Sequence, residues 1–448
     1  MVTRRLLVLT LGVGLGGCTL ITDSFVSNDF SGDAFPVNVD TTSGAILVGM
    51  HPYGDAIEPA VLDVLSPLTI VDPGPGVVPS VSFANITMLG GSPSDPTDQV
   101  PRARFPGAQL IAIHPCDASD SNADGACHVG PAGSTEFHGI LGADVLAGDD
   151  IRLRLAADQL FVLPDVGGSD RGRSLDCDAV FGSPYRGGGT LVIAGTELPF
   201  GNRRIAIQAC LSPNPDAALQ SQRGMDALFV ASTGLGISIL GQSAYQRYLG
   251  IHPGAPGLDT LPADTVYLPS GIVHGQRATI DSLALVGASG ANELSPCRQI
   301  YAHRVLAPRS LGSSCDTRTN ADCPCEDDST FCTVPAILEL TPPGGFDVLV
   351  IADSDPTLQA LRAELRPDQP EIDGILGTGV LRAAEFDVDY PHDRLLARCP
   401  GGDCCVRPEF TQESDRDQIN NCLRLQGCAT CELHNIKDPL PCPATPPE

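Results

Sequence analysis

The stretch VASTGLGISILGQSAYQ, from Val230 to Gln246, decides the fold that the sequence predicts. A hydrophobic run leads into Ser-Thr-Gly, a second hydrophobic run follows, and the polar residues after it begin a helix-like segment. A small polar turn between two segments that are apolar enough to be buried is typical of a turn whose position has a role. Ser232, Thr233 and Gly234 are therefore the first candidates for a functional site.

A second stretch, earlier in the chain, has the same pattern. AVLDVLSPLTIV (Ala60 to Val71) aligns with LFVASTGLGISIL (Leu228 to Leu240), and this alignment places Asp63 opposite Ser232. In both stretches the polar residue lies between two apolar runs that are predicted to be strands.

Each of these stretches is followed by the same downstream motif. FHGILGADVL from Phe137 and IDGILGTGVL from Ile372 share Gly-Ile-Leu-Gly, then two residues, then Val-Leu. Because strand, polar turn, strand and Gly-Ile-Leu-Gly occur in the same order twice, the sequence predicts a duplicated domain.

Composition favours an all-β protein and excludes a nucleic-acid-binding one. The 448 residues include 48 glycines and 39 prolines, and short apolar runs bounded by Gly, Pro and Asp recur along the chain. The net charge is −27, and Lys437 is the only lysine. A protein that binds nucleic acid needs a basic surface to neutralise phosphates, so we expect no nucleic-acid partner.

The first residues, MVTRRLLVLTLGVGLGGC, have the order of an export signal: two arginines, an apolar run and small residues. Leu15-Gly16-Gly17-Cys18 resembles the box of a bacterial lipoprotein signal. The resemblance implies a signal peptide over residues 1–17, lipidation of Cys18 and a polar tether over 18–43. The partner would be a membrane, held through the lipid anchor, and Thr19 favours the outer membrane of a Gram-negative bacterium. The alternative is an ordinary signal peptide with an incidental cysteine.

The cysteines also indicate export. There are 17, and removing Cys18 leaves 17 − 1 = 16, an even number that suits disulfides in an oxidising compartment. Five fall in an insertion over residues 297–332 and seven lie between Cys399 and Cys442, mostly in a tail over 401–448. The CATC motif at Cys428 could be half of a zinc site, but without a second matched motif disulfides are favoured.

The ordered motifs resemble those of the aspartic peptidase family, of the pepsin and retropepsin type. STGLGISILGQSAYQ is similar to the family's second Asp-Thr-Gly segment and its following helix, and ILGTGVLRAAEFDVDYPHDRLLA is similar to the pepsin-type C-terminal run. The resemblance implies an all-β fold of two pseudo-symmetric six-stranded lobes, over residues 44–170 and 186–400, with a cleft between them. It also implies a mechanism in which one carboxylate from each lobe shares a single proton.

This chain departs from the family at the catalytic positions. The first lobe has Asp63-Val64-Leu65 and the second has Ser232-Thr233-Gly234, so the second aspartate is absent. There is also no tyrosine between residues 64 and 139, where the family carries one on its flap. Asp63, Ser232, Thr233 and Gly234 are therefore interpreted as the remnant of a catalytic site. Asp72 also precedes a glycine turn and could be aligned with Ser232 in place of Asp63. That choice spoils the match of the residues that follow Asp63 with those that follow Ser232, so we interpret Asp72 as a turn residue.

Two functions of different classes follow from these motifs. The first is a non-catalytic protein that binds a peptide or other ligand in the cleft or serves as a surface interaction protein. The second is a residual endopeptidase that uses Asp63. Cleavage of a peptide library between about pH 3 and 8 that depends on Asp63 would distinguish them.

One further motif could hold a metal. CDASDSNADGAC places Asp120, Asn122 and Asp124 at the alternating spacing of a calcium loop, between Cys116 and Cys127. Position 12 of the loop is Pro131 instead of glutamate, so an EF-hand is not supported. A Ca²⁺ site and an acidic loop closed by a disulfide remain open as alternatives, and no other cofactor is expected.

Overall fold

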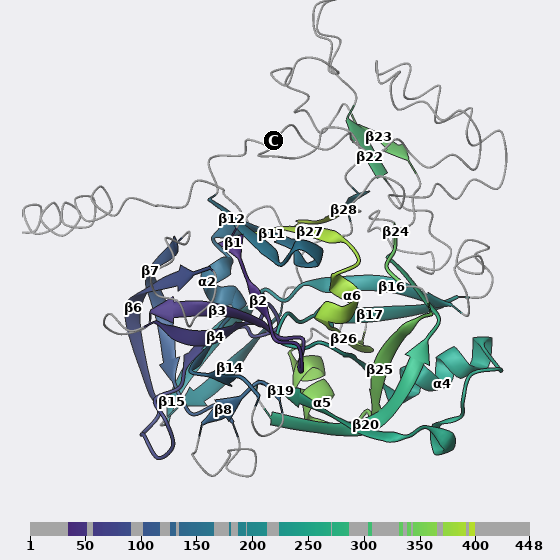
Figure 1. The fold of residues 1–448 in the computed structure, drawn as a ribbon, viewed down its shortest axis with the longest axis horizontal. Helices are drawn as coiled ribbons and strands as arrows, with labels where there is room; N and C mark the ends of the chain where they lie inside the picture. The colour runs from purple at the N-terminus through teal and green to yellow at the C-terminus, as the bar shows by residue number, and fades with distance from the viewer. Residues whose placement is uncertain are drawn as a thin grey trace, which may run out of the picture.

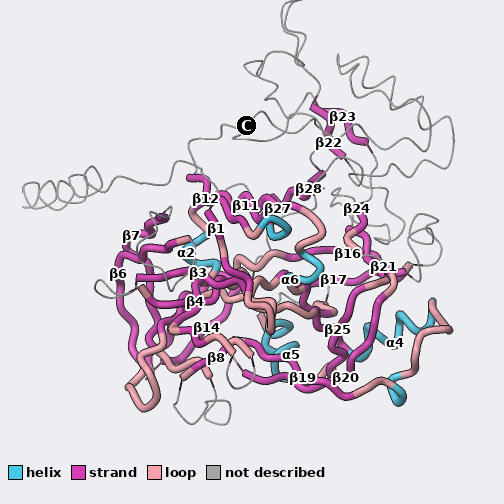
Figure 2. The backbone as a smooth tube through the Cα atoms, in the orientation of Figure 1, coloured by secondary structure: helices cyan, strands magenta, loops and turns pink. Residues whose placement is uncertain are grey.

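The computed structural model describes most of the chain between residues 35 and 398. The described residues are 35–51, 57–90, 102–116, 126–130, 134–164, 179–180, 187–193, 195–212, 224–269, 271–285, 303–306, 331–334, 338–341, 344–364, 371–390 and 394–398. Strands dominate this part of the chain and helices are short (Figure 2). No helix in the described ranges is long and apolar enough to cross a bilayer. The fold is all-β, as predicted.

The first half of the chain forms a seven-stranded sheet in the order β2-β3-β4-β10-β5-β7-β6. The sheet curls on itself because β6 also pairs with β3. Its strands are β2 (Asn38–Val39), β3 (Ile46–His51), β4 (Glu58–Leu62), β5 (Thr69–Val71), β6 (Ser80–Leu89), β7 (Arg102–Ala112) and β10 (Gly139–Leu141).

The second half forms a nine-stranded sheet in the order β19-β20-β25-β18-β26-β17-β16-β21-β24. Its strands are β16 (Ala206–Ser212), β17 (Met225–Ala231), β18 (Ser238–Gly241), β19 (Ala263–Leu268), β20 (Gly271–Ile280), β21 (Ser282–Leu285), β24 (Leu338–Glu339), β25 (Phe346–Ile351) and β26 (Gly374–Leu376).

The centres of the two sheets have the same topology. In the first, β10 runs parallel to β4 and antiparallel to β5, and β5 runs parallel to β7. In the second, β26 runs parallel to β17 and antiparallel to β18, and β18 runs parallel to β25. The register also matches, since Ile140 pairs with Val61 and Ile375 pairs with Val230. The predicted duplication is thus confirmed by strand order, direction and register.

A third, eight-stranded sheet joins the halves in the order β1-β12-β11-β27-β28-β13-β22-β23. Short helices α2 (Ala143–Leu146) and α6 (Thr378–Leu381) follow the two Gly-Ile-Leu-Gly segments and lead into β11 and β27, which pair with each other. Figure 1 shows β12, β11, β27 and β28 in a row above the first lobe, in purple and blue, and the second, in teal and green. The strands are β1 (Phe35–Pro36), β11 (Asp149–Arg154), β12 (Gln159–Pro164), β13 (Ala179–Val180), β22 (His303–Leu306), β23 (Phe331–Val334), β27 (Glu385–Asp389) and β28 (Arg394–Arg398).

Two expectations about the architecture differ from the structure. The polar segment up to residue 43 was expected to be a tether, but β1 pairs with β12 and β2 pairs with β3. Phe35 is fully buried, so hydrophobic burial holds the end of this segment in the fold. The lobes are also larger than six strands each, because the hairpins β6–β7 and β19–β20 and the strand β24 extend their sheets.

A capped helix precedes the second Gly-Ile-Leu-Gly segment. Helix α5 spans Pro356–Ala363, and the Asp355 carboxylate caps it by accepting a hydrogen bond from the Thr357 N–H at 2.9 Å. Leu358 and Leu361, three residues apart on the helix, are buried. Helix α4 spans Gln242–Ile251, and the remaining elements are β8 (Cys127–His128), β9 (Glu136–Phe137), β14 (Gly187–Ile193), β15 (Thr196–Asn202), η1 (Leu155–Ala157) and η2 (Leu258–Thr260).

Candidate active site between the two lobes

Asp63 and Ser232 lie at equivalent places in the two halves. Asp63 follows β4 and its N–H donates to the Leu141 carbonyl at 3.0 Å, while Ser232 follows β17 and its N–H donates to Leu376 at 2.8 Å. Leu141 and Leu376 are the leucines of the two Gly-Ile-Leu-Gly segments. The motifs that the sequence shares are therefore hydrogen-bonded to each other in both lobes.

A second equivalent pair of contacts lies six residues after each turn residue. The Thr69 hydroxyl accepts a hydrogen bond from the Gly142 N–H at 3.1 Å, and the Ser238 hydroxyl accepts one from Gly377 at 3.1 Å. These contacts fix the alignment of Asp63 with Ser232, and a shift to Asp72 would break it. Asp72 itself accepts a hydrogen bond from the Gly74 N–H at 2.8 Å, as a turn residue does.

The structure brings Asp63 and Ser232 into direct contact. The Ser232 hydroxyl donates to Asp63 Oδ1 at 2.9 Å. The same oxygen accepts three backbone N–H groups, from Leu65 at 3.0 Å and from Thr233 and Gly234 at 3.2 Å each. The Asp63 carboxylate therefore joins the two lobes, because three of its four donors belong to the second lobe.

Thr233 joins the lobes in the opposite direction. Its hydroxyl donates to the Leu62 carbonyl at 2.6 Å and accepts from the Val64 N–H at 3.1 Å. Its own carbonyl accepts a hydrogen bond from the Ile46 N–H at 2.8 Å. Val64 occupies the equivalent position in the first lobe and has no hydroxyl, so this side-chain contact is made from one lobe only.

Gly234 and Leu65 occupy equivalent positions and fill space differently. A Cβ added to Gly234 would lie 2.9 Å from Asp63 Cγ, so only glycine lets the second-lobe turn approach the carboxylate. Leu65 instead extends into a buried cluster that includes Val230 and Leu235 of the second lobe. The Leu65 side chain thus contributes apolar contact between the lobes.

Arg204 is a third group that contacts the Asp63 turn, through the Leu65 carbonyl. Its guanidinium hydrogen-bonds to the Leu65 carbonyl and forms two bonds with the Glu364 carboxylate, at 2.9 and 2.8 Å. Arg204 is only 6% exposed, so this ion pair is buried. It joins the segment just before β16 to Glu364 at the end of α5. The sequence does not predict this ion pair, because no local pattern distinguishes Arg204 from Arg203 as a partner of the Asp63 turn.

The electrostatics of the centre follow from its burial. Asp63 is 5% exposed and Ser232 and Thr233 are fully buried. Burial raises the pKa of the Asp63 carboxyl, and the hydrogen bonds to it and the charge of Arg204 oppose this shift without cancelling it. Burial also raises the pKa of the Tyr390 hydroxyl, with a further contribution from the Asp63 charge.

As a chemical centre, this arrangement offers one carboxyl group and one serine hydroxyl. In the described residues the side-chain partner of the carboxylate is a hydroxyl that donates to it, which is not an acid at ordinary pH. A proton shared between two carboxylates, which the dyad mechanism needs, has no counterpart in this contact.

The other predicted site residues lie outside the described residues. They are Cys18, proposed for lipidation, and Asp120, Asn122 and Asp124 of the possible calcium loop. Cys116 and Cys127, which flank that loop, form a disulfide. Cys332 is the only cysteine of the 297–332 insertion that the described ranges include, and the tail over 401–448 is outside them.

No family model and no curated protein matches the chain. Among solved structures, an aspartic proteinase from Irpex lacteus is similar at 12% identity, over 82% of this chain and 97% of that one, with a TM-score of 0.36. Basic 7S globulin from soybean is similar at 10% identity, over 81% and 94% of the two chains, with a TM-score of 0.38. The all-β, two-lobed architecture of this chain is defined by its own strand order and register.

Proposed function

We propose that this protein is an exported, lipid-anchored ligand-binding protein in which an aspartic-peptidase-like centre has become a structural joint. Residues 1–17 act as the signal and Cys18 carries the lipid, which holds the protein at the outer membrane. Incorporation of labelled fatty acid that is lost in Cys18→Ser tests the anchor. If the unmutated chain incorporates no labelled fatty acid, the proposed lipid anchor is refuted.

The observation that carries the proposal is the set of four hydrogen bonds to Asp63 Oδ1. A peptidase carboxylate has to face water and substrate, whereas this oxygen faces three backbone N–H groups and the Ser232 hydroxyl. A buried carboxylate held in this way stabilises the contact between the lobes.

A pocket lined mainly by residues of the first lobe supports ligand binding. It has a volume of about 580 Å³, within the size range of small-molecule and peptide sites, and begins at Pro67 and Leu68, just beyond the Asp63 turn. Apolar and charged groups share its wall, which suits an extended peptide. They include Phe105, Phe200, Arg104, Gln109 and Asp144.

Binding can be tested on the mature protein with an array of immobilised peptides. Phe200→Ala removes an aromatic ring from the pocket wall, and we expect it to weaken binding of captured peptides by about tenfold or more. Phe83→Ala is the matched control, because Phe83 is 74% exposed on β6 and does not line the pocket. Equal binding by both variants would place the ligand elsewhere.

A residual endopeptidase is the second candidate function, favoured by the raised pKa of Asp63. A carboxyl that keeps its proton in mildly acidic solution could act as an acid. Incubation of the mature protein with a diverse peptide library from about pH 3 to 8 tests this, with Asp63→Asn as the control. Cleavage that disappears in Asp63→Asn would overturn the non-catalytic proposal.

A further inference from the structure

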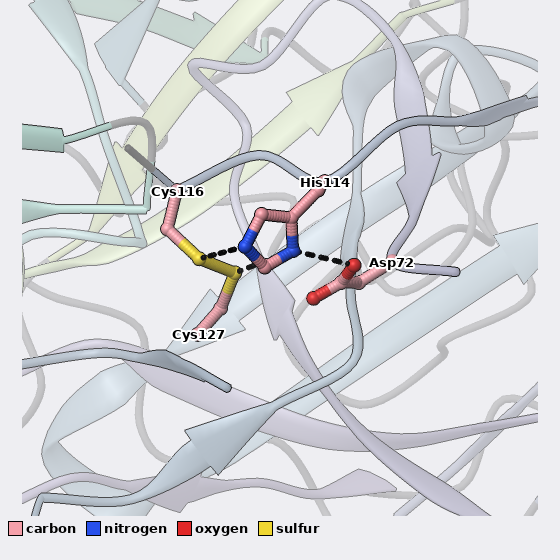
Figure 3. Close-up of side chains that lie close together, drawn as sticks. All are labelled: Asp72, His114, Cys116 and Cys127. Atoms are coloured by element: carbon pink, nitrogen blue, oxygen red, sulfur yellow. Dashed lines mark hydrogen bonds and ion pairs between the residues drawn. A yellow bond between two sulfur atoms is a disulfide. The ribbon is translucent and has the colours of Figure 1, made fainter. Parts of the chain in front are cut away.

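A cluster of four potential metal ligands lies at one edge of the first lobe. Asp72 follows β5 and His114 follows β7, while Cys127 begins β8. Because β5 and β7 run parallel and Val71 pairs with Ala112, the residues just beyond both strands meet at the same edge. One donor atom from each of Asp72, His114, Cys116 and Cys127 lies within 4.8 Å of all the others (Figure 3).

The imidazole of His114 is the centre of this cluster. Its Nδ1 lies 2.9 Å from Asp72 Oδ1, and its Nε2 lies 3.4 Å from Cys116 Sγ. Cys127 Sγ, which is bonded to Cys116 Sγ, lies 3.7 Å from Nδ1. Figure 3 shows the ring between the carboxylate and the disulfide, with its two nitrogens directed at different partners.

The contact with Asp72 determines which nitrogen is available. A carboxylate that accepts from Nδ1–H fixes the tautomer in which Nε2 carries a lone pair, and Nε2 is the nitrogen nearer to Cys116. Metal-binding histidines in proteins usually have this second contact to a carboxylate. Two thiolates and such an imidazole are the donors that Zn²⁺ prefers.

We propose that Cys116, Cys127 and Nε2 of His114 form a zinc site when the disulfide is reduced, with Asp72 positioning His114. The same two sulfurs are then either bonded to each other or bound to the metal. The cluster is enclosed but reachable, since the His114 side chain is 17% exposed and that of Asp72 is 6% exposed. This site is separate from the Asp63 centre and does not depend on the function proposed for it.

The exchange requires a dithiol reductant, which the proposal includes. The S–S bond of Cys116–Cys127 breaks as it accepts two electrons and two protons, and the reductant becomes a disulfide. When Zn²⁺ binds, both thiol protons leave to water and two Zn–S bonds form. The sulfurs must separate to about 3.7 Å, the spacing of two ligands on a tetrahedral zinc with Zn–S near 2.3 Å, and rotation of the two cysteine side chains provides this.

The test uses the mature full-length protein in detergent, reduced with a phosphine without unfolding. Alkylation and mass spectrometry show when Cys116 and Cys127 are free, and a chromophoric chelator then reports zinc affinity. We expect reduction to add one zinc per chain, and Co²⁺ in its place to show the thiolate charge-transfer absorption of a tetrahedral site. His114→Ala should abolish this binding, and Asp72→Asn should weaken it by about 10- to 100-fold.

Two controls address the other cysteines and histidines. The double change Cys116→Ser with Cys127→Ser should remove the added zinc, whereas His274→Ala, on the exposed surface of β20, should leave it unchanged. Equal zinc uptake by the double variant and the unmutated chain would overturn the proposal. A Cys116–Cys127 bond that opens only when the protein unfolds would also overturn it.

A redox titration gives a second, independent readout. Zinc that binds only the dithiol form must shift the equilibrium toward that form, by about elevenfold when free zinc is about ten times its dissociation constant. For a two-electron couple this is a shift of about 30 mV. An unchanged ratio of dithiol to disulfide at saturating zinc would contradict the site.

Discussion

Replacing Asp63 with alanine should destabilise this protein, and the size of the effect can be worked from the contacts of the carboxylate. The change removes the acceptor for the N–H groups of Leu65 and Thr233 and for the buried Ser232 hydroxyl, whereas the Gly234 N–H keeps the Ser232 hydroxyl as a partner at 3.2 Å. A buried donor left unpaired costs about 1–3 kcal/mol, so three of them predict a loss of about 3–9 kcal/mol.

Asparagine at the same position provides the matched comparison. Asp63→Asn keeps an Oδ1 acceptor in the same shape and replaces Oδ2 with an NH2 group, which carries two N–H donors, so we expect a smaller loss of about 1–3 kcal/mol. Urea unfolding of the mature protein with its disulfides intact measures both changes. Catalytic groups are commonly held at a cost to stability. A variant Asp63→Ala as stable as the unmutated chain would therefore refute the structural joint and favour a retained chemical role.

Three further predictions use the same assay. Thr233→Val leaves a carbonyl and an N–H unpaired and should cost about 2–5 kcal/mol, whereas Thr233→Ser keeps the hydroxyl and should cost about 1 kcal/mol; equal losses would contradict the role of the hydroxyl. Because the pKa of Asp63 is raised from 3.8 in the folded state, its protonation favours folding. The stability of the protein relative to Asp63→Asn should therefore fall as pH rises above about 4. A relative stability that rises with pH would show that folding lowers the pKa of Asp63. Arg204→Met removes the guanidinium that pairs with the buried Glu364 carboxylate and should cost about 3–5 kcal/mol. Arg277→Met, which breaks the half-exposed ion pairs with Asp264 and Asp347, should cost less than about 1 kcal/mol. Similar losses would show that burial is not the deciding factor.

The duplication and the position of the candidate site could be predicted from the sequence because they depend on local patterns. Apolar runs, a polar turn and Gly-Ile-Leu-Gly occur in the same order twice and define the two turns, and the structure shows the same pairings around both. The contact between Asp63 and Ser232 follows once the two turns are aligned.

The surroundings of the site could not be predicted in the same way. Arg204 and Glu364 are separated by 160 residues, and no periodicity in either segment indicates that they meet. Asp72 was correctly interpreted as a turn residue, but its contact with His114 depends on the parallel pairing of β5 with β7. Leu65 aligns with Gly234, and only the fold shows the buried cluster of second-lobe residues that accommodates its larger side chain.

The two lobes contribute different groups to the centre. The first lobe contributes the carboxylate of Asp63, and three of the four donors to it lie in the second lobe. The second lobe contributes Thr233 and Gly234, and the Thr233 hydroxyl bonds to the first lobe's backbone on both sides of Asp63. A second carboxylate at Ser232 would place two like charges at this buried contact and raise its energy unless they shared a proton. A serine at position 232 therefore avoids this electrostatic cost, and its hydroxyl and the neighbouring Thr233 hydroxyl hold the two lobes together.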